Sequence, residues 1–215
     1  MREEYNANLK CHRQGISHEE MVSNYNSWAA KYDWDLRPGI YNGPEIITKF
    51  MAEYYFSDIR ETLKIIDVAA GTGRVGEELK KYGFKNVDAL EPSDKMLEIA
   101  KLKKTYKNYH IESLSSHKTK INDDSYDCLI SSGGMGEGHI PTAALQEMIR
   151  IVRPGGSLFI VMREEYLKEV KEYNGKLEPF MEELTEKQLW RRKSRIVVPN
   201  YSFQKNGVVF IYEIL

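Results

Sequence analysis

Residues 64–76, KIIDVAAGTGRVG, constrain the fold more than any other part of the chain. They open with a short apolar run rich in β-branched residues, which predicts a buried strand. Asp67 interrupts that run, and a carboxylate in a buried strand is costly unless it has a partner. Gly71 and Gly73 then allow a tight turn and close approach of a ligand, and the helix after them would present free N–H groups. This pattern predicts a nucleotide-type binding turn.

Composition narrows the class of protein. A length of 215 residues suits one α/β domain with a modest appendage, and a formal net charge of −1 argues against a chain-wide nucleic-acid or anionic-membrane partner. Cys11 and Cys128 form neither a disulfide framework nor a zinc spacing. No segment is long and apolar enough to span a bilayer or to act as a secretion signal. We therefore expect a soluble, cytoplasmic protein without metal.

Strand and helix patterns alternate after the binding turn. Short apolar runs predict further strands at 86–90, 109–112, 126–131 and 157–162, with helices between them, one of them at 141–152. This rhythm favours a doubly wound parallel sheet with right-handed crossovers and ligands at the carboxyl ends of its strands.

The end of the chain changes character. A charged helical region is expected over residues 164–193. Strands at 196–198 and 208–214 follow it, and a loop containing Asn206-Gly207 lies between them. This pattern predicts an antiparallel hairpin that closes the sheet.

The N-terminal region precedes this fold. Residues 1–16 are polar and are expected to be mobile or loosely packed, and SHEE at 17–20 is a capping-box signature that opens a helix. Tyr25, Trp28 and Tyr32 then recur at helical spacing. Their aromatic face suits either a helix packed on the core or a lid over a ligand, and both interpretations can hold together.

Two classes of site use such a glycine turn. GTGRVG at 71–76, with Glu91 about twenty residues further on, matches the dinucleotide fingerprint. The wider pattern DVAAGTG, however, resembles motif I of the class I S-adenosylmethionine-dependent methyltransferases, in which the acidic strand residue helps to hold the ammonium of the cofactor. The resemblance implies S-adenosylmethionine as cofactor, S-adenosylhomocysteine as product, and cofactor contacts from Asp67, Ala69, Gly71, Thr72 and Gly73.

The next strand carries a second motif. LEPSDKML is similar to the family segment in which an acidic residue accepts both ribose hydroxyls, a task that suits the two oxygens of a carboxylate. The resemblance assigns this role to Glu91, with Pro92 next to it. Met96 would flank the adenine, although core packing explains a methionine there equally well.

Two later strand ends complete the implied site. Relatives often carry an aspartate and a small or apolar residue beside the adenine, whereas this chain has Glu112 and Ser113, so that Ser113 and Leu114 are weaker candidates for that position. DCLISSGG is similar to motif IV, whose loop lies between cofactor and substrate, and it contributes Ser131 and Ser132. The chain lacks the N-P-P-Y or D-P-P-Y signature of amino methylation on adenine or glutamine.

His139, in GEGHIP, is the candidate catalytic residue. An imidazole titrates near neutral pH and can act as a general base, but a loop histidine can equally serve as a backbone hydrogen-bond partner. Arg163, at the end of the last parallel strand, would meet an acidic substrate group or be solvated. The other histidines have no supporting context and are expected at the surface: His12, His18, His110 and His117.

The N-terminal helix shows a further resemblance. YNSWAAKYD is similar to a segment that many small-molecule methyltransferases place before motif I, in which an aromatic residue closes over the cofactor. This resemblance makes Tyr25, Trp28 and Tyr32 candidates for cofactor contact. It also divides the chain into a helical lid at 1–42 and a methyltransferase core at 43–215.

These resemblances together imply an α/β fold, a doubly wound, seven-stranded, mostly parallel sheet of the Rossmann-like methyltransferase type with an antiparallel C-terminal hairpin and an N-terminal helical lid. The implied reaction is in-line methyl transfer to a small-molecule acceptor in a closed site. Alternatives are an S-adenosylmethionine sensor or scaffold without catalysis, and a protein or RNA methyltransferase. An NAD-dependent oxidoreductase would need a hydride-site pattern such as Y-x-x-x-K, which is absent. The acceptor and the oligomeric state stay open, with a monomer as one possibility.

Overall fold

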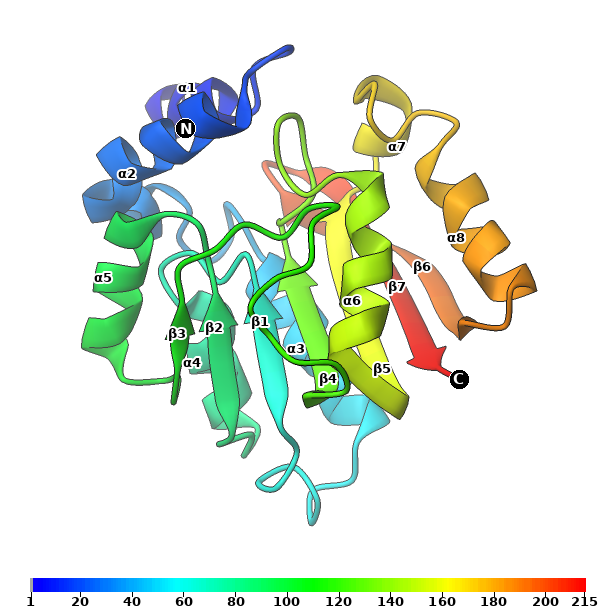
Figure 1. Ribbon diagram of the computed structural model, residues 1–215. Helices are drawn as coiled ribbons and strands as arrows, with labels where there is room; N and C mark the ends of the chain where they lie inside the picture. Colours follow the sequence, from blue (N-terminus) through cyan, green and yellow to red (C-terminus); the bar gives the residue numbers. More distant parts are fainter. Residues whose placement is uncertain (1) are drawn as a thin grey trace.

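A seven-stranded sheet in the order β3-β2-β1-β4-β5-β7-β6 runs through the centre of the computed structural model, which describes residues 2–215, with side chains from residue 4 onward (Figure 1). The parallel strands are β1 (Ile65–Val68), β2 (Val87–Leu90), β3 (Tyr109–His110), β4 (Tyr126–Ser132) and β5 (Val152–Arg163). β7 (Lys205–Ile214) is antiparallel to both β5 and β6 (Trp190–Ser202). The doubly wound sheet with its C-terminal hairpin is confirmed.

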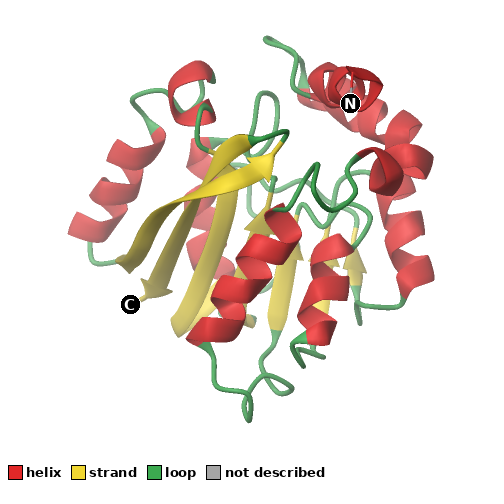
Figure 2. Ribbon diagram, turned by 180° about the vertical axis from the view of Figure 1, so that it is seen from behind, coloured by secondary structure: helices red, strands yellow, loops and turns green. Residues whose placement is uncertain are grey.

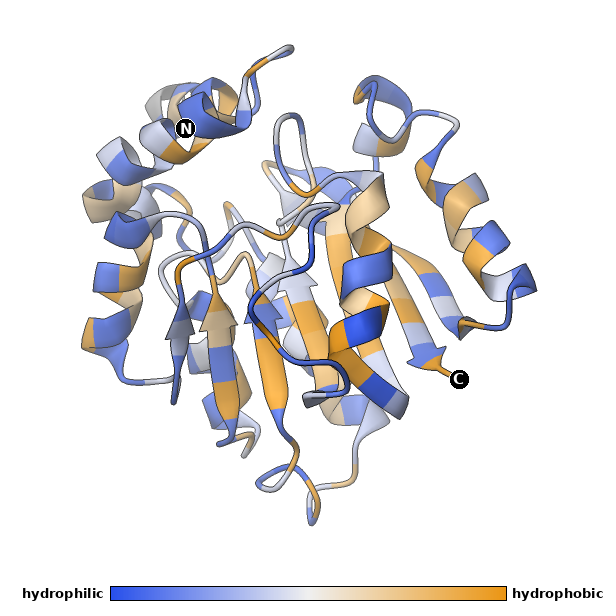
Figure 3. Ribbon diagram, in the orientation of Figure 1, coloured by the Kyte–Doolittle hydropathy of each residue, from blue (hydrophilic) through white to orange (hydrophobic). Residues whose placement is uncertain are grey.

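Helices cover both faces of the sheet. One face carries α3 (Gly43–Tyr54), α4 (Arg74–Lys81) and α5 (Asp94–Lys103), and the other carries a 3₁₀ turn (Thr142–Ala144), α6 (Leu145–Ile151), α7 (Tyr166–Glu169) and α8 (Leu177–Glu186) (Figure 2). Successive strand residues point to opposite faces, so Ile65 packs with α3 and α4 while Ile66 packs with α6 and α8. Hydrophobic residues are concentrated in the strands between these layers (Figure 3).

The N-terminal region is more ordered than its polarity predicts. Residues Arg2–Cys11 form α1, and Cys11 is only 1% exposed. The expectation of a mobile or loosely packed segment is therefore wrong for the described part of 1–16, because Ala7 and Cys11 lie one helical turn apart and pack together onto the core. Met1 lies outside the described residues.

α2 (His18–Asp35) begins where the capping box predicts. The Ser17 side chain accepts a hydrogen bond from the Glu20 N–H at 3.1 Å. The helix lies above the carboxyl ends of the strands and packs against α5 (Figure 1). None of the helices within residues 2–215 combines the length and apolar character needed to cross a bilayer.

The predicted helical region at 164–193 is wrong in extent. It holds only α7 and α8, separated by Gly175, whose φ of 64° interrupts any helix, and β6 already begins at Trp190. The indole of Trp190 stacks on Tyr212 at 3.9 Å between ring centroids, and this buried contact fixes the start of the strand.

The hairpin turn also lies elsewhere than predicted. Phe203 and Gln204 form it, both with positive φ, while Asn206 and Gly207 belong to β7. A Cβ at Gly207 would lie 2.7 Å from the Tyr201 ring. Glycine is therefore required here because the neighbouring strand leaves no room for a side chain, and not because the turn needs it.

Three boundaries differ in smaller ways. The third strand is shorter than predicted and stops at His110. The fifth starts at Val152, so that it includes the RPGG segment. The helix at 141–152 is divided between a 3₁₀ turn and α6.

Candidate functional site

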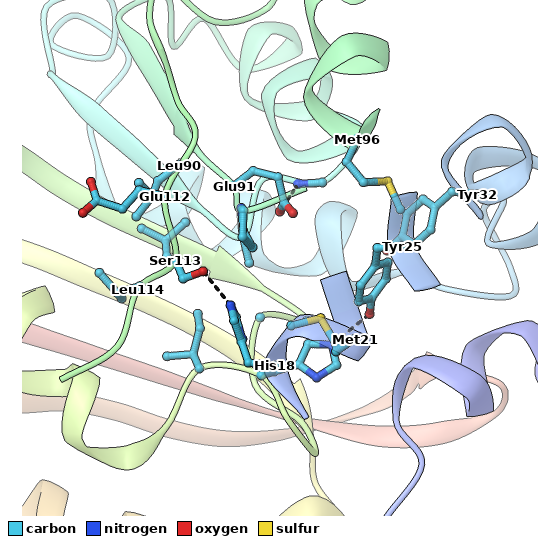
Figure 4. A pocket seen from close by; sticks show the side chains of 18 residues that line it. His18, Met21, Tyr25, Tyr32, Leu90, Glu91, Met96, Glu112, Ser113 and Leu114 are labelled. Carbon is cyan, nitrogen blue, oxygen red and sulfur yellow. Dashed lines mark hydrogen bonds between the residues drawn. The ribbon is translucent and has the colours of Figure 1, made fainter. Parts of the chain in front are cut away.

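A cavity lies at the carboxyl ends of β1, β2 and β4, beneath α2 (Figure 4). This is the edge at which parallel α/β sheets bind ligands. Sequence-predicted residues that line it are Tyr25, Tyr32, Ala69, Gly71, Glu91, Pro92, Met96, Ser113, Leu114 and His139. The predicted residues outside its walls are Trp28, Asp67, Thr72, Gly73, Ser131 and Ser132.

The glycine turn forms the floor of this cavity. Gly71 and Gly73 have φ values of 53° and 89°, and a Cβ at Gly73 would lie 3.2 Å from the Ala100 Cβ, so both positions favour glycine. Ala69 also has a positive φ, of 59°, which is unusual for a residue with a side chain. This backbone strain coincides with the cavity wall, as strain often does at ligand sites.

Glu91 spans the turn and the end of β2. It is only 6% exposed, yet it lines the cavity. Its Oε2 accepts the Gly71 N–H at 3.0 Å and its Oε1 accepts the Ser93 N–H at 2.9 Å. Burial raises the pKa of this carboxyl to about 7. Each oxygen keeps a further lone pair that a ligand hydroxyl can use.

Asp67 lies behind the turn and not on the cavity wall. Its Oδ2 accepts the Tyr106 hydroxyl at 2.5 Å, and Tyr106 in turn accepts the Gly76 N–H at 3.1 Å. The other oxygen, Oδ1, is buried without a protein partner. Burial raises the pKa of Asp67 to about 8, although the Tyr106 hydrogen bond opposes this rise. Sequence reasoning missed Tyr106, because nothing in its local pattern shows that it faces β1.

Of the other predicted residues outside the cavity walls, one packs in the hydrophobic core and two line a neighbouring hollow. Trp28 packs in the core, and its Nε1 donates to Asp35 Oδ2 at 2.7 Å. Thr72 and Ser132 line a small hollow that shares Ala69 and Gly71 with the main cavity.

Two of the three predicted serine and threonine hydroxyl groups near this hollow are hydrogen-bonded to residues outside the seven strands, and the third has no protein partner. The Thr72 hydroxyl donates to Asp33 of α2 at 2.5 Å, and Ser132 Oγ lies 2.8 Å from the Tyr41 hydroxyl. Ser131 Oγ is buried without a protein partner.

His139 meets α2 across the cavity. Its Nδ1 donates to the Glu137 carbonyl at 2.7 Å, so Nε2 accepts the Tyr25 hydroxyl at 2.9 Å. Burial lowers the pKa of His139 to about 4, and burial raises the pKa of Tyr25 well above its usual value. The imidazole is therefore neutral at pH 7, and its basic nitrogen is already engaged.

Two histidines expected at the surface lie at the site, and that expectation is wrong for them. His18 lines the cavity, with Nε2 at 2.6 Å from Ser113 Oγ and Nδ1 at 3.3 Å from the Gly138 carbonyl (Figure 4). His12 stacks on His139 with 4.5 Å between ring centroids. These contacts join residues about a hundred positions apart in the chain. The local sequence around either histidine therefore could not predict them.

The other two histidines are arranged differently. His117 has an exposed side chain 3.2 Å from Glu112, whereas His110 is half-buried in β3. Within residues 2–215, no group of three or more His, Cys, Asp or Glu side chains is placed to hold a metal ion.

Comparison with known proteins bears on this cavity. A family model described as a methyltransferase domain matches residues 66–160, which include the glycine turn, Glu91 and the loop after β4. Human methyltransferase-like protein 27 is 26% identical over 166 residues, which cover 77% of this chain and 66% of that protein. Over residues 66–160 the chain is therefore similar to the class I S-adenosylmethionine-dependent methyltransferase family, and it spans less than two thirds of the length of the curated relatives it matches. The cofactor of this family is S-adenosylmethionine.

Other methyltransferases are similar to this chain over part of its length or in fold. A demethylmenaquinone methyltransferase of Renibacterium salmoninarum is 33% identical over 99 residues, which cover 45% of this chain and 40% of the relative. A SAM-dependent methyltransferase from Aquifex aeolicus has the same fold, with a TM-score of 0.61 at 21% identity over 88% of this chain and 98% of that one. A putative RNA methyltransferase from Pyrococcus horikoshii also superposes, with a TM-score of 0.56 at 13% identity over 81% of this chain and 82% of that one. The fold therefore leaves the acceptor open.

Proposed function

We propose that this chain transfers a methyl group from S-adenosylmethionine to a small-molecule acceptor inside the closed cavity. The observation that carries this proposal is the roof that α2 forms over the glycine turn and Glu91. When bound, the cofactor supplies an electrophilic methyl group: an electron pair of the acceptor bonds to the methyl carbon while the carbon–sulfur bond breaks and its electrons stay on sulfur.

The residues around the cavity suit this cofactor. Glu91 is placed to accept the ribose hydroxyls through its unused lone pairs, and the backbone at Ala69 and Gly71 is open to close approach. The orphaned Oδ1 of Asp67 suits a water-mediated link to the ammonium of the methionine part. Met96 and Leu114 offer apolar contact to the adenine.

We assign two tasks to the protein, which are to orient the acceptor relative to the cofactor and to exclude water from the site. His139 holds the Tyr25 hydroxyl and takes a proton from an acceptor only once that hydrogen bond opens. Because charge is lost from sulfur as the methyl group leaves, no strong oxyanion stabiliser is needed, and proximity in a dry site provides the main effect. A proton acceptor is required only for substrates that must lose a proton.

We assign residues 1–42 to a lid because α2 is attached to the core by polar links at several points. Besides the Tyr25, His18 and Thr72 contacts, Asn26 Oδ1 accepts the Ser93 hydroxyl at 2.6 Å. Polar links of this kind can exchange with water, so they suit a segment that opens and closes.

A small acceptor follows from this roof, because a polymer would have to displace α2. Bacterial relatives named demethylmenaquinone methyltransferases act, by that name, on a small molecule, which supports the same class of acceptor here.

The test is transfer of a labelled methyl group from S-adenosylmethionine into three separated fractions of a cell extract: small molecules, proteins and RNA. We expect label in the small-molecule fraction with the wild-type chain and its loss with Glu91→Ala. Label confined to protein or RNA would contradict the proposed acceptor class. Binding of S-adenosylhomocysteine without any transfer would indicate a sensor or scaffold instead.

A further inference from the structure

One polar contact at the edge of the cavity joins α2 to the loop after β3. His18, the first residue of α2, and Ser113 both line the cavity, and His18 Nε2 lies 2.6 Å from Ser113 Oγ. Figure 4 shows the Ser113 hydroxyl pointing toward the imidazole. The opposite ring nitrogen, Nδ1, lies 3.3 Å from the carbonyl oxygen of Gly138. The imidazole therefore bridges two loops that border the cavity.

His18 is held in place from two directions. Ser17, the N-cap of α2, accepts the Glu20 N–H at 3.1 Å and so fixes the start of the helix. On the other side the backbone of Gly138 lies against Ile16, which is 5% exposed. A Cβ at Gly138 would lie 2.7 Å from the Ile16 Cγ2, so this approach requires a glycine. The position of the His18 ring is therefore fixed by its neighbours.

The two partners of His18 decide the direction of its hydrogen bond with Ser113. A carbonyl oxygen only accepts, so the ring nitrogen that faces Gly138 carries the hydrogen. A neutral imidazole has one N–H, so Nε2 is an acceptor and the Ser113 hydroxyl donates to it. The hydroxyl hydrogen is thereby used, while the oxygen keeps lone pairs. Toward the cavity Ser113 can accept a hydrogen bond but cannot donate one.

The neighbouring Glu112 also lines the cavity, but its carboxylate is engaged elsewhere. Its Oε1 lies 3.2 Å from His117 Nε2, and its Oε2 accepts the Lys120 N–H at 3.2 Å. Figure 4 shows this carboxylate turned away from the Ser113 hydroxyl. Of these two polar side chains, Ser113 is therefore the one that presents its oxygen to a ligand in the cavity.

The order of the strands places Ser113 on the side where the base of the cofactor would lie. β2 lies between β1, which leads into the glycine turn, and β3, which leads to Ser113. Glu91 at the end of β2 is assigned to the ribose, and the methionine part is assigned to the side of the glycine turn. The base and the methionine part are attached at opposite ends of the sugar, so the base would extend toward β3. Leu114, which is 4% exposed, offers it an apolar contact there, and the amino group of adenine is a hydrogen-bond donor.

We infer that His18 sets the specificity of this chain for the base of its cofactor: it keeps Ser113 a hydrogen-bond acceptor, and Ser113 accepts the amino group of adenine. A base with a carbonyl oxygen in that place would be rejected, because two acceptors would then face each other. This inference rests on the proposed function, because it concerns recognition of S-adenosylmethionine. His18 is a positioning residue, since it acts on the base through Ser113.

A base with a carbonyl oxygen cannot be accommodated without loss of a hydrogen bond. If the Ser113 hydroxyl turned toward that oxygen, Nε2 of His18 would lose its donor. If the imidazole moved its hydrogen to Nε2, the contact with the Gly138 carbonyl would be lost. Either change leaves a polar group unpaired, and a site built around a hydrogen bond discriminates against an analogue that cannot make it.

The test compares two ligands that differ only in the base. Titration calorimetry on the full chain would measure S-adenosylhomocysteine against S-inosylhomocysteine, whose base carries a carbonyl oxygen in place of the amino group. The titration is made at about pH 8, above the ordinary pKa of an imidazole. We expect the adenine ligand to bind about tenfold or more tightly, on the scale of a polar group left unpaired. Equal affinities in the wild type would overturn the inference.

Variants separate recognition of the base from loosening of α2. His18→Phe keeps a ring but frees the Ser113 hydroxyl, so it should reduce the preference for adenine to about twofold or less, and Ser113→Ala should do the same. Tyr25→Phe, which removes another link between α2 and the core, is the matched control. It should weaken both ligands alike and keep their ratio. A ratio that survives in a folded His18→Phe or Ser113→Ala chain, or that falls equally in Tyr25→Phe, would contradict the assignment.

The tautomer of His18 provides an independent measurement on the wild-type chain. Nitrogen chemical shifts of the imidazole, measured by NMR, should show the hydrogen on Nδ1. A hydrogen on Nε2 would overturn the inference even if neither variant folds. Failure of the wild-type chain to bind S-adenosylhomocysteine would contradict the proposed function itself, whereas binding without a preference for adenine would overturn only the role of His18 and Ser113.

Discussion

The hydroxyl of Tyr25 donates a hydrogen bond to Nε2 of His139 over 2.9 Å, which joins α2 to the loop after β4 across the cofactor cavity. The other ring nitrogen of His139 is held by the Glu137 carbonyl, and burial keeps the pKa of the ring at about 4. A neutral imidazole with both nitrogens engaged is well placed to orient a phenol. The same contact links the position of α2 to the loop that lines the cavity.

Tyr25→Phe should loosen α2 without unfolding the core. The change leaves Nε2 of a buried histidine without its donor, at a cost of about 1–3 kcal/mol. We expect faster amide exchange over residues 20–34 in the presence of S-adenosylhomocysteine, while exchange in the central strands stays as in the wild type. Tyr54→Phe, on α3 away from the cavity, is the matched control. Equal exchange in both variants would show that the Tyr25 hydroxyl does not hold α2.

Ligand should order α2 in the wild-type chain. Residues of this helix line the cavity, and several of its contacts with the core are polar, so we expect amides at 20–34 to exchange rapidly in the free protein and to slow markedly with S-adenosylhomocysteine. The strands β1 to β5 should change much less. If α2 is equally protected with and without ligand, it is an ordinary packed helix, and its aromatic face is core.

Glu91→Ala should weaken binding of S-adenosylhomocysteine by about 1.5–3 kcal/mol, the usual scale for hydrogen bonds to a charged group. The Glu91 side chain lines the cavity and also holds the Gly71 N–H, so the variant removes a ligand contact and loosens the turn. Calorimetry measures the affinity. Glu98→Ala, on the exposed side of α5, should bind as the wild type does, and an unaltered affinity in Glu91→Ala would refute the ribose assignment.

Asp67→Asn should stabilise the ligand-free chain most at high pH. Burial raises the pKa of Asp67 to about 8 from an ordinary value of 3.8, so between these values the folded chain holds a proton that the unfolded chain has released. Stability from this group is therefore lost as pH rises through that window, at about 1.4 kcal/mol for each unit of pKa difference. Asparagine stays neutral and escapes the loss. Urea unfolding at pH 5 and pH 9 measures the effect, and a gain no larger at pH 9 than at pH 5 would contradict it.

Much of the fold could be predicted because its signals are local. The apolar run before Gly71, the cap at Ser17 and the alternation of strands with helices are each read within short segments, and this alternation predicts a doubly wound parallel sheet. The two apolar runs at the end of the chain likewise predicted the antiparallel hairpin of β6 and β7.

The predictions that were wrong concern packing over long distances. Asn206-Gly207 resembles a hairpin turn, but Gly207 is required because the Tyr201 ring lies against it. Because residues 1–16 are mostly polar, the sequence predicted a loosely packed segment and not the burial of Cys11. Likewise, the contact of His18 with Ser113 joins two segments that only the complete fold brings together. Periodicity reports which face of an element is apolar, but it does not report which distant residue that face meets.

Calorimetric titration of the full chain with S-adenosylhomocysteine, alongside NAD, tests the central claim most directly. The dinucleotide fingerprint and the methyltransferase motif share the same glycine turn, so only the ligand distinguishes the two uses. We predict saturable binding of S-adenosylhomocysteine at one site per chain, and no heat of binding with NAD at the same concentrations. Binding of NAD without binding of S-adenosylhomocysteine would contradict the methyltransferase account.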